Sequence, residues 1–241
     1  MKRLPYKNDF IVFMARAGAL LFGDFTTKSG RKTPYFINTG NYRRGGQIAR
    51  LGRFYAACVM ENIESGLMRE PTALFGPAYK GIPLAVAASI ALAEEGLNVG
   101  YCFNRKEEKD HGEGGGMVGY PLKASDRVLI TEDVITAGTA VRECLPLLRR
   151  AEVKVTGLVV AVDRMERGGS DMSAIRELEV KEGIKTYPLV TVRDIIECLH
   201  DRPVDGTVLM NDGVRRRMEE YLERYGCNMY DSRQEAEHEK Q

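Results

Sequence analysis

An apolar segment that passes through two acidic residues into a Thr- and Gly-containing loop, and then into a helix, constrains the fold of this chain more than any other part. The segment VLITEDVITAGTAVREC occupies residues 128–144. Val128, Leu129 and Ile130 form a continuous apolar run, which is typical of a parallel strand covered on both faces. Apolar positions from Val141 onward recur with helical spacing. A strand, a loop and a helix in this order indicate an α/β fold.

The loop of this segment is a candidate anion site. Glu132 and Asp133 stand where the predicted strand ends, and the first backbone N–H groups of a helix lack intrahelical acceptors. The loop has no Lys of the kind that G-x-x-x-x-G-K-[ST] requires, and no G-x-G-x-x-G lies between strand and helix, so the commoner nucleotide loops are excluded. Two carboxylates suit a ligand that brings sugar hydroxyls and Mg²⁺, such as a phosphorylated ribose. The alternative is an ordinary turn with Thr139 as helix N-cap.

Composition agrees with one enzyme domain. The chain has 241 residues, of which 44% are hydrophobic and 29% charged, so residues 1–228 can form a single domain with a sizeable core. The net charge is +1, and acidic residues are interspersed among the Arg and Lys residues, which argues against a nucleic-acid partner. The five Cys residues lack C-x-x-C spacing and indicate neither zinc nor a disulfide framework. No apolar run is long enough for a membrane span, and we expect no membrane partner and a cytoplasmic location.

Apolar periodicity along the chain predicts helices that alternate with strands. The predicted helices cover residues 10–22, 45–65, 82–95, 171–182, 192–199 and 211–225, and the predicted strands cover residues 72–75, 99–103, 128–131, 155–162 and 185–190. This alternation implies a right-handed, mainly parallel sheet. Residues 25–42 are predicted to form a hairpin or extended flap beside the sheet. We expect the polar tail, residues 229–241, to be disordered.

Cationic side chains follow two of the predicted strands. Lys80 comes after the strand 72–75 and a Gly-Pro turn, and the carboxyl edge of a parallel sheet is where α/β proteins bind ligands, so it is well sited to meet the phosphate of an anionic ligand. Arg164 ends the strand 155–162, and Arg is the preferred partner of a planar carboxylate. The alternative for Lys80 is an ordinary solvent-exposed lysine, and the alternative for Arg164 is a structural ion pair without a ligand.

Two further segments contain candidate binding residues. In the predicted flap, Lys28 precedes a turn, and Tyr35 and Phe36 cannot both be core residues because successive strand residues face opposite ways. The Gly-rich segment NRKEEKDHGEGGG, residues 104–116, has the composition of a mobile lid, with solvated surface as the alternative. A G-x-G-x-x-G match within residues 114–119 is discounted because no helix opens after it.

The segment 128–144 resembles the 5-phosphoribosyl-1-diphosphate (PRPP) motif of the type I phosphoribosyltransferases: a hydrophobic strand, two acids and a Thr/Gly phosphate loop. With the other segments in order, the resemblance runs from about Tyr6 to Tyr225 and is strongest to the members that act on orotate. It implies an α/β type I phosphoribosyltransferase fold, with a mainly parallel central sheet flanked by helices, a small hood built from both termini and a flexible catalytic loop. Glu132 stands where Asp is common and Tyr35 where Phe is expected.

The resemblance implies a role for each candidate residue. The implied orotate-binding residues are Lys28, Tyr35, Phe36, Thr136 and Arg164, with Arg164 on the orotate carboxylate. The implied PRPP-binding residues are Lys28, Tyr79, Lys80, Arg105, Lys106, Lys109, His111, Glu132, Asp133, Val134, Ile135, Thr136, Ala137, Gly138, Thr139 and Ala140. Lys109, His111 and Asp133 are the implied catalytic residues, and either Lys109 or His111 could protonate the leaving group.

The implied reaction transfers the phosphoribosyl group of PRPP to a ring nitrogen of orotate in pyrimidine biosynthesis. Mg²⁺ would be held mainly by PRPP rather than by side chains, and the family forms homodimers whose loop reaches the neighbour's site. Two alternatives remain. Lys28 and Arg164, which suit an acid-bearing base, argue against a purine phosphoribosyltransferase. The cationic lid and the lack of a basic surface argue against a non-enzymatic PRPP-sensing regulator.

Overall fold

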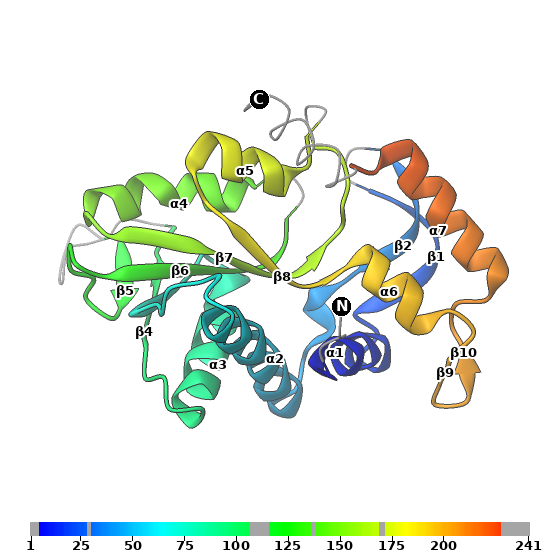
Figure 1. Cartoon of the computed structure of the whole chain (residues 1–241), viewed down its shortest axis with the longest axis horizontal. Coiled ribbons are helices and arrows are strands. Elements are labelled where there is room, and N and C mark those ends of the chain that lie inside the picture. The colour runs from blue at the N-terminus through cyan, green and yellow to red at the C-terminus, as the bar shows by residue number, and fades with distance from the viewer. Residues whose placement is uncertain (1–4, 28–29, 107–115, 136–137, 169–171, 228–241) are drawn as a thin grey trace.

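A six-stranded sheet forms the centre of the molecule (Figure 1). The computed structural model describes residues 5–27, 30–106, 116–135, 138–168 and 172–227. In spatial order the strands are β5 (Met117–Gly119), β4 (Gly100–Asn104), β3 (Ala73–Gly76), β6 (Arg127–Val134), β7 (Lys154–Asp163) and β8 (Thr186–Thr191). Neighbouring strands are parallel except β4 and β5, which are antiparallel. The predicted mainly parallel sheet is confirmed.

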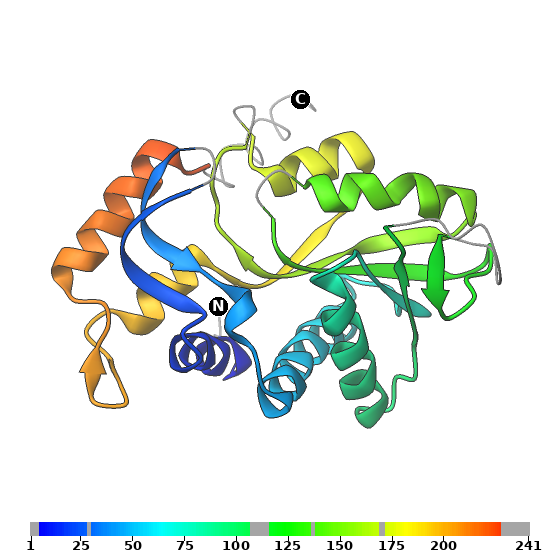
Figure 2. The same ribbon diagram turned by 180° about the vertical axis from the view of Figure 1, so that it is seen from behind.

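Helices cover both faces of this sheet (Figures 1 and 2). On one face lie α2 (Gly45–Glu64) and α3 (Gly81–Glu94), and on the other lie α4 (Thr139–Arg150) and α5 (Ala174–Glu182). Along β6, Leu129 packs into the core on the α2 side, whereas Val128 and Ile130 pack into the core on the α4 side. Burial on both faces explains why this strand is continuously apolar rather than alternating.

Elements from both ends of the chain form a smaller unit beside the sheet, which we call the hood (Figure 1). Its members are α1 (Pro5–Arg16), β1 (Leu20–Thr26), β2 (Lys32–Ile37), α6 (Val192–Leu199), β9 (Pro203–Val204), β10 (Thr207–Val208) and α7 (Asp212–Tyr225). The hairpin of β1 and β2 is antiparallel, α7 packs against β2 and α1 packs against α6. On β2, Tyr35 is fully buried whereas Phe36 is 38% exposed, so the prediction that only one of them is a core residue is confirmed.

The structure corrects the prediction for residues 10–22. The helix ends at Arg16, Gly18 adopts a positive φ of 63°, and the following apolar residues belong to β1. The left-handed conformation is easily reached by glycine and turns the chain out of the helix. Apolar periodicity alone could not separate the end of a helix from the start of a strand.

Some short elements were not predicted, namely β5, β9, β10 and a 3-10 turn at Thr39–Asn41. The polar tail 229–241 and most of the predicted lid lie outside the described residues. None of the described helices is long and apolar enough to span a membrane.

The strand order fixes where a ligand can bind. The chain runs from β3 through α3 to β4 on one side, and from β6 through α4 to β7 on the other, so the direction of winding reverses between β3 and β6. In open α/β sheets the crevice outside the carboxyl ends of the strands at such a point is the usual ligand site.

Candidate active site

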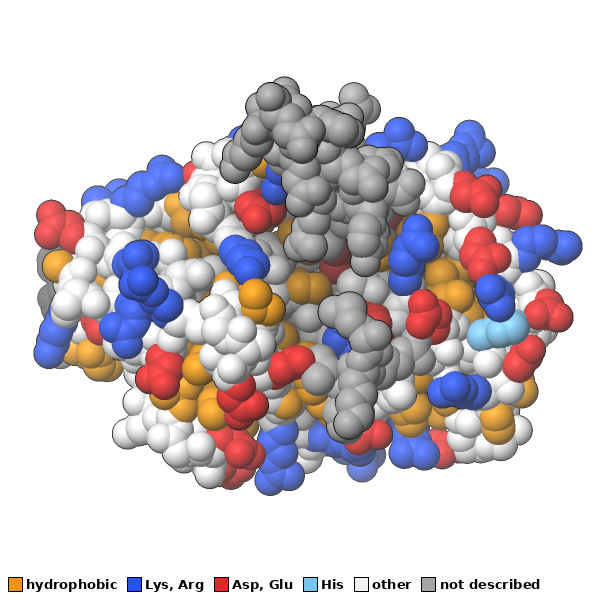
Figure 3. Space-filling view, viewed as in Figure 1, with side chains coloured by type: hydrophobic (Ala, Val, Ile, Leu, Met, Phe, Trp, Pro, Cys, Tyr) orange, Lys and Arg blue, Asp and Glu red, His pale blue; other side chains and the backbone are white. Residues whose placement is uncertain are grey.

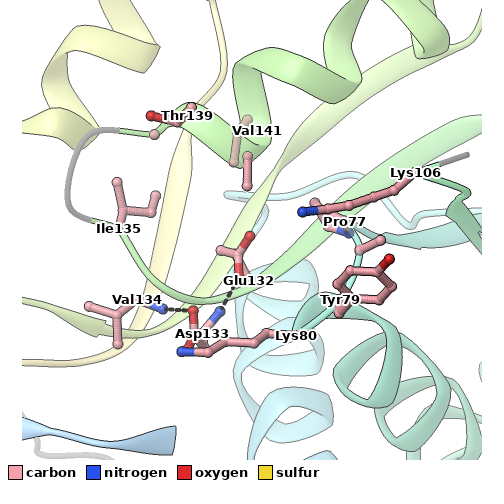
Figure 4. A pocket seen from close by; sticks show the side chains of 13 residues that line it. Pro77, Tyr79, Lys80, Lys106, Glu132, Asp133, Val134, Ile135, Thr139 and Val141 are labelled. Carbon is pink, nitrogen blue, oxygen red and sulfur yellow. Dashed lines mark hydrogen bonds and ion pairs between the residues drawn. The ribbon is translucent and has the colours of Figure 1, made fainter.

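A cavity of about 430 Å³ lies at the carboxyl ends of β3 and β6 (Figure 4). Its lining residues are Pro77, Ala78, Tyr79, Lys80, Lys106, Glu132, Asp133, Val134, Ile135, Gly138, Thr139, Ala140 and Val141. They come from the β3–α3 turn, the segment after β4, the end of β6 and the start of α4. The cavity therefore occupies the crevice at which the strand order reverses.

Two buried carboxylates form one wall of the cavity. Glu132 and Asp133 are each 7% exposed. Asp133 Oδ2 accepts hydrogen bonds from Lys80 Nζ at 2.8 Å and from the Thr39 hydroxyl at 2.5 Å, and Oδ1 accepts from the Val134 N–H at 2.8 Å. Glu132 Oε1 accepts the Asp133 N–H at 3.0 Å. Both acids are thus held by β6 and its neighbours before any ligand arrives.

The two acids have opposite protonation tendencies. Burial raises the pKa of Glu132 above its ordinary value, although the Asp133 N–H opposes this shift. Burial would also raise the pKa of Asp133, but hydrogen bonds from Lys80 and Thr39 outweigh it and keep this pKa below its ordinary value. A protonated Glu132 beside an ionised Asp133 avoids placing two charges side by side.

The first turn of α4 faces the same cavity. Gly138 is the N-cap residue, has a φ of 68°, and supplies no side-chain cap, so Thr139 is the first helical residue rather than the cap. A residue with a Cβ is strained at this φ. The alternative with Thr139 as N-cap is therefore wrong. Uncapped N–H groups at a helix start suit a phosphate or another anion.

Two cationic side chains also line the cavity: Lys80 lies directly beside Asp133, and Lys106 lies farther from the acids, near Pro77 and Tyr79 (Figure 4). Lys80 pairs with Asp133, and Lys106 Nζ lies 5.0 Å from the centre of the Tyr79 ring, which is 66% exposed. The turn that carries Tyr79 is held by the Ala78 N–H, which donates to Asn104 Oδ1 at 2.8 Å. The cavity therefore has an acidic wall next to β6 and cationic groups next to β3 and β4.

Close packing brings the β3–α3 turn to this position. A Cβ at Gly76 would lie 2.2 Å from the carbonyl oxygen of Gly81, and a Cβ at Gly81 would lie 2.9 Å from that of Thr131. Both distances are shorter than Cβ contacts in real proteins. The chain can therefore pack closely on itself at Gly76, and against β6 at Gly81, only because both positions are glycine.

Arg164 lies at the same edge of the sheet in a second group of residues. It follows β7, in which Val162 pairs with Val134 of β6. Its guanidinium carbon lies 4.6 Å from the centre of the Tyr35 ring, and its Nε donates to Glu166 Oε1 at 2.9 Å. This group joins the sheet to the hood.

The structure brings together most of the described residues that were predicted for PRPP. Those that line the cavity are Tyr79, Lys80, Lys106, Glu132, Asp133, Val134, Ile135, Gly138, Thr139 and Ala140. Arg105, Tyr35, Phe36 and Arg164 are not among its described lining residues. Phe36 stacks on Phe25 with ring centres 5.5 Å apart. Lys28, Lys109, His111, Thr136 and Ala137 lie outside the described residues.

Sequence reasoning missed three residues that hold site groups in place. Thr39 binds Asp133, Asn104 binds the turn before Lys80, and Glu166 binds Arg164. Thr39 and Asp133 are 94 positions apart in the chain, so no local pattern could pair them. Glu166 lies two positions after Arg164, in the segment VDRMERG at residues 162–168, and this spacing was the available signal.

Carboxylate oxygens are the ligands that Mg²⁺ prefers, and Glu132 and Asp133 supply them at the cavity. Among the described residues, the one group of at least three potential metal ligands is His200, Asp201 and Asp212, which lies in the hood. On the face shown in Figure 3, acidic and basic side chains are intermixed, without a continuous basic track.

Comparison with known proteins gives one family. The model of the phosphoribosyl transferase domain matches residues 38–190. The chain is 51% identical over 224 residues to an orotate phosphoribosyltransferase of Clostridium beijerinckii, covering 92% of this chain and 98% of that protein. It is 48% identical over 225 residues to the one from Bifidobacterium adolescentis, covering 91% and 97%. The crystal structure of the Francisella tularensis orotate phosphoribosyltransferase has a TM-score of 0.76 at 34% identity, covering 90% of this chain and 99% of that one.

Proposed function

The chain belongs to the phosphoribosyltransferase family, among the orotate phosphoribosyltransferases, and we propose that it transfers the phosphoribosyl group of PRPP to orotate. The products are orotidine monophosphate and diphosphate, and the reaction belongs to pyrimidine biosynthesis. One observation carries the assignment of the site. The end of β6 places two buried carboxylates next to the uncapped first turn of α4, in one cavity with Lys80.

The geometry supports a specific division of labour for PRPP. The backbone N–H groups that begin α4 take the 5-phosphate, because they lack intrahelical acceptors. Asp133 and Glu132 accept hydrogen bonds from the ribose hydroxyls. Lys80 and Lys106, which both line the cavity, take the diphosphate, together with Arg105, which precedes Lys106 in the chain.

Stabilisation of the charges that develop in the transition state explains the catalysis. As the bond from the ribose to the diphosphate lengthens, the sugar gains positive character and the leaving group gains negative charge. Lys80 and Lys106 stabilise the leaving group, together with Lys109 or His111 from the loop, and such preorganised charges are often the largest contribution to catalysis. Asp133, whose pKa is lowered, stays ionised beside the electron-poor sugar.

Mg²⁺ would be held mainly by PRPP, and the carboxylate oxygens of Glu132 and Asp133 at the cavity are groups that would suit it as further ligands. When bound, Mg²⁺ neutralises phosphate charge. Orotate binds next to the ribose, with its carboxylate on Arg164 and its ring near Tyr35 and Phe36, and Lys28 and Thr136 complete that pocket. The working form is a homodimer in the cytoplasm, with the loop 104–116 of one subunit at the site of the other.

Product formation with different bases tests this function directly. The protein is mixed with PRPP, Mg²⁺ and, in turn, orotate, uracil, adenine, guanine or hypoxanthine, and diphosphate release is measured. We expect efficient release with orotate alone, because uracil lacks the carboxylate that Arg164 binds. Arg164→Ala should raise the orotate KM and reduce the discrimination against uracil. Equal turnover of uracil and orotate by the unmodified protein would overturn the assignment.

A further inference from the structure

Glu166 is the centre of a partly buried polar group between the sheet and the hood. Its Oε1 accepts from Arg164 Nε at 2.9 Å and from the Tyr35 hydroxyl at 2.9 Å, and its Oε2 accepts from Arg31 Nη1 at 3.3 Å. The Glu166 side chain is 15% exposed and that of Arg164 is 9% exposed. One carboxylate therefore joins a residue after β7 to two residues of the hood.

These contacts fix both the edge and the face of the Arg164 guanidinium. Glu166 holds the Nε edge, and the Tyr35 ring covers one face at 4.6 Å from the guanidinium carbon. Nη2 is buried and lies 2.8 Å from the same Glu166 Oε1, so this nitrogen also pairs with the carboxylate. A guanidinium has five N–H donors, so donors that do not face Glu166 remain for a ligand carboxylate.

The backbone around Glu166 is attached to the hood independently of its side chain. Glu166 forms an isolated bridge with Gly226, the Arg167 N–H donates to the Tyr225 carbonyl at 2.9 Å, and the Cys227 N–H donates to the Met165 carbonyl at 2.8 Å. A change confined to the Glu166 side chain thus leaves these attachments in place. The carboxylate can be tested separately from the fold.

We propose that Glu166 is a positioning residue that orients the Arg164 guanidinium for the orotate carboxylate and links this orientation to the hood through Tyr35 and Arg31. The inference rests on the proposed function and adds a residue that acts through Arg164 rather than on the substrate.

The charges of the group agree with this role. The guanidiniums of Arg164 and Arg31 with the carboxylate of Glu166 leave a net charge of +1, which one ligand carboxylate neutralises. Arg164 has several rotatable bonds, and fixing such a side chain before binding reduces the entropy that the ligand must otherwise offset. Glu166 therefore raises the affinity for the acid-bearing base while touching only the protein.

Glu166→Gln tests the proposal, because the amide keeps the shape and one acceptor oxygen but removes the charge. We expect the orotate KM to rise by about tenfold, with the PRPP KM changed by less than about twofold. Glu182→Gln is the matched control, since Glu182 forms an ion pair with Arg149 at 2.7 Å on the surface. Thermal unfolding confirms that each variant is folded. A merely structural role for Glu166 would change the melting temperature, or kcat and both KM values together, without this selective rise.

A double-mutant cycle with Arg164→Ala shows whether Glu166 acts through Arg164. If it does, Glu166→Gln has almost no further effect on orotate KM when Arg164 is already Ala. Additive effects in the cycle, or an unchanged orotate KM in folded Glu166→Gln, overturn the proposal.

Tyr35→Phe is the second variant, to be used if Glu166→Gln does not fold. It removes a hydroxyl donor to Glu166 but keeps the ring, and it should raise the orotate KM by about threefold. An unchanged KM in that variant also overturns the proposal. Failure of the unmodified protein to use orotate contradicts the proposed function instead.

Discussion

Lys80 and Asp133 form an ion pair in the lining of the cavity, with Nζ 2.8 Å from Oδ2. Asp133 is also held by Thr39, whereas the Lys80 side chain is 68% exposed. The proposed roles of the two residues require Lys80 to meet the diphosphate and Asp133 to meet the ribose. We therefore expect PRPP binding to exchange this ion pair for contacts to the ligand, with the more exposed partner, Lys80, as the side chain that moves.

Asp133→Asn should weaken PRPP binding by about tenfold or more, because an amide lacks the charge that complements the metal-bound ligand and accepts fewer hydroxyl hydrogen bonds. Isothermal titration calorimetry with PRPP and Mg²⁺ measures the affinity. Asp205→Asn is the matched control, since Asp205 pairs with Arg16 at 2.7 Å on the surface of the hood. Unchanged affinity in the Asp133 variant would contradict the role of this acid.

Glu132→Gln should make the protein more stable at alkaline pH. Burial raises the folded-state pKa of Glu132, so the folded protein retains a proton that the unfolded chain releases as the pH rises. Stability is therefore fully present below the unfolded pKa and is lost as the pH rises through the folded pKa, whereas Gln is uncharged throughout. The gain above the raised pKa should be on the order of 1 to 3 kcal/mol, and almost nothing at about pH 4.

Thermal unfolding from about pH 4 to about pH 9 measures this effect. Glu143→Gln removes the same charge at an exposed position of α4 and serves as the matched control. A stability difference between Glu132→Gln and the unmodified protein that is constant over the whole range would argue against a raised pKa.

Thr39→Val should weaken PRPP binding severalfold, because the hydroxyl that donates to Asp133 at 2.5 Å is replaced by a methyl group. Without this donor the pKa of Asp133 should also rise toward its ordinary value. Thr39→Ser keeps the hydroxyl and should bind PRPP nearly as the unmodified protein does. Normal PRPP binding by Thr39→Val together with weakened binding by Thr39→Ser would show that the Thr39 methyl group, rather than its hydrogen bond to Asp133, matters for the site.

The sheet and the phosphate-loop half of the site could be predicted from the sequence because each depends on neighbouring residues. The run from Val128 to Ile130 indicates burial on both faces, and Glu132 and Asp133 follow directly in the chain. The cavity then collects the residues that follow β3 and β6, since parallel strands end at the same edge.

The parts that could not be predicted depend on contacts between distant segments. Thr39 meets Asp133, and Arg31 meets Glu166, only because the hood folds back onto the sheet. The helix end at Arg16 was missed for a different reason, since the apolar residues that follow suit a strand equally well. Local pattern cannot specify such contacts, which are set by how the elements pack.

Lys109→Ala should act mainly on kcat, lowering it by about a hundredfold or more, if Lys109 binds the leaving group chiefly in the transition state. Steady-state kinetics with orotate and PRPP, together with calorimetric PRPP affinity, separate the two effects. His111→Ala measured in the same way identifies which loop residue protonates the diphosphate. A normal kcat in the Lys109 variant would exclude it from the transition state.

A mixed dimer tests whether the loop acts on the neighbouring subunit. Lys109→Ala and Asp133→Asn proteins, each nearly inactive alone, are unfolded and refolded together. In a mixed dimer, one site then combines an intact Asp133 with an intact loop from the partner, and the other site carries both lesions. Random exchange makes about half of the dimers mixed, so activity should recover to roughly one quarter of the unmodified level.

Mixing Asp133→Asn with Arg164→Ala gives the control for this experiment. Both changes lie in the body of the subunit, so every site of every mixed dimer keeps one lesion, and activity should not exceed the average of the two components. Subunit exchange is verified with a tag on one protein and mass measurement of the purified dimers. If exchange is complete and the Lys109→Ala and Asp133→Asn mixture stays as inactive as its components, the loop serves the site of its own chain.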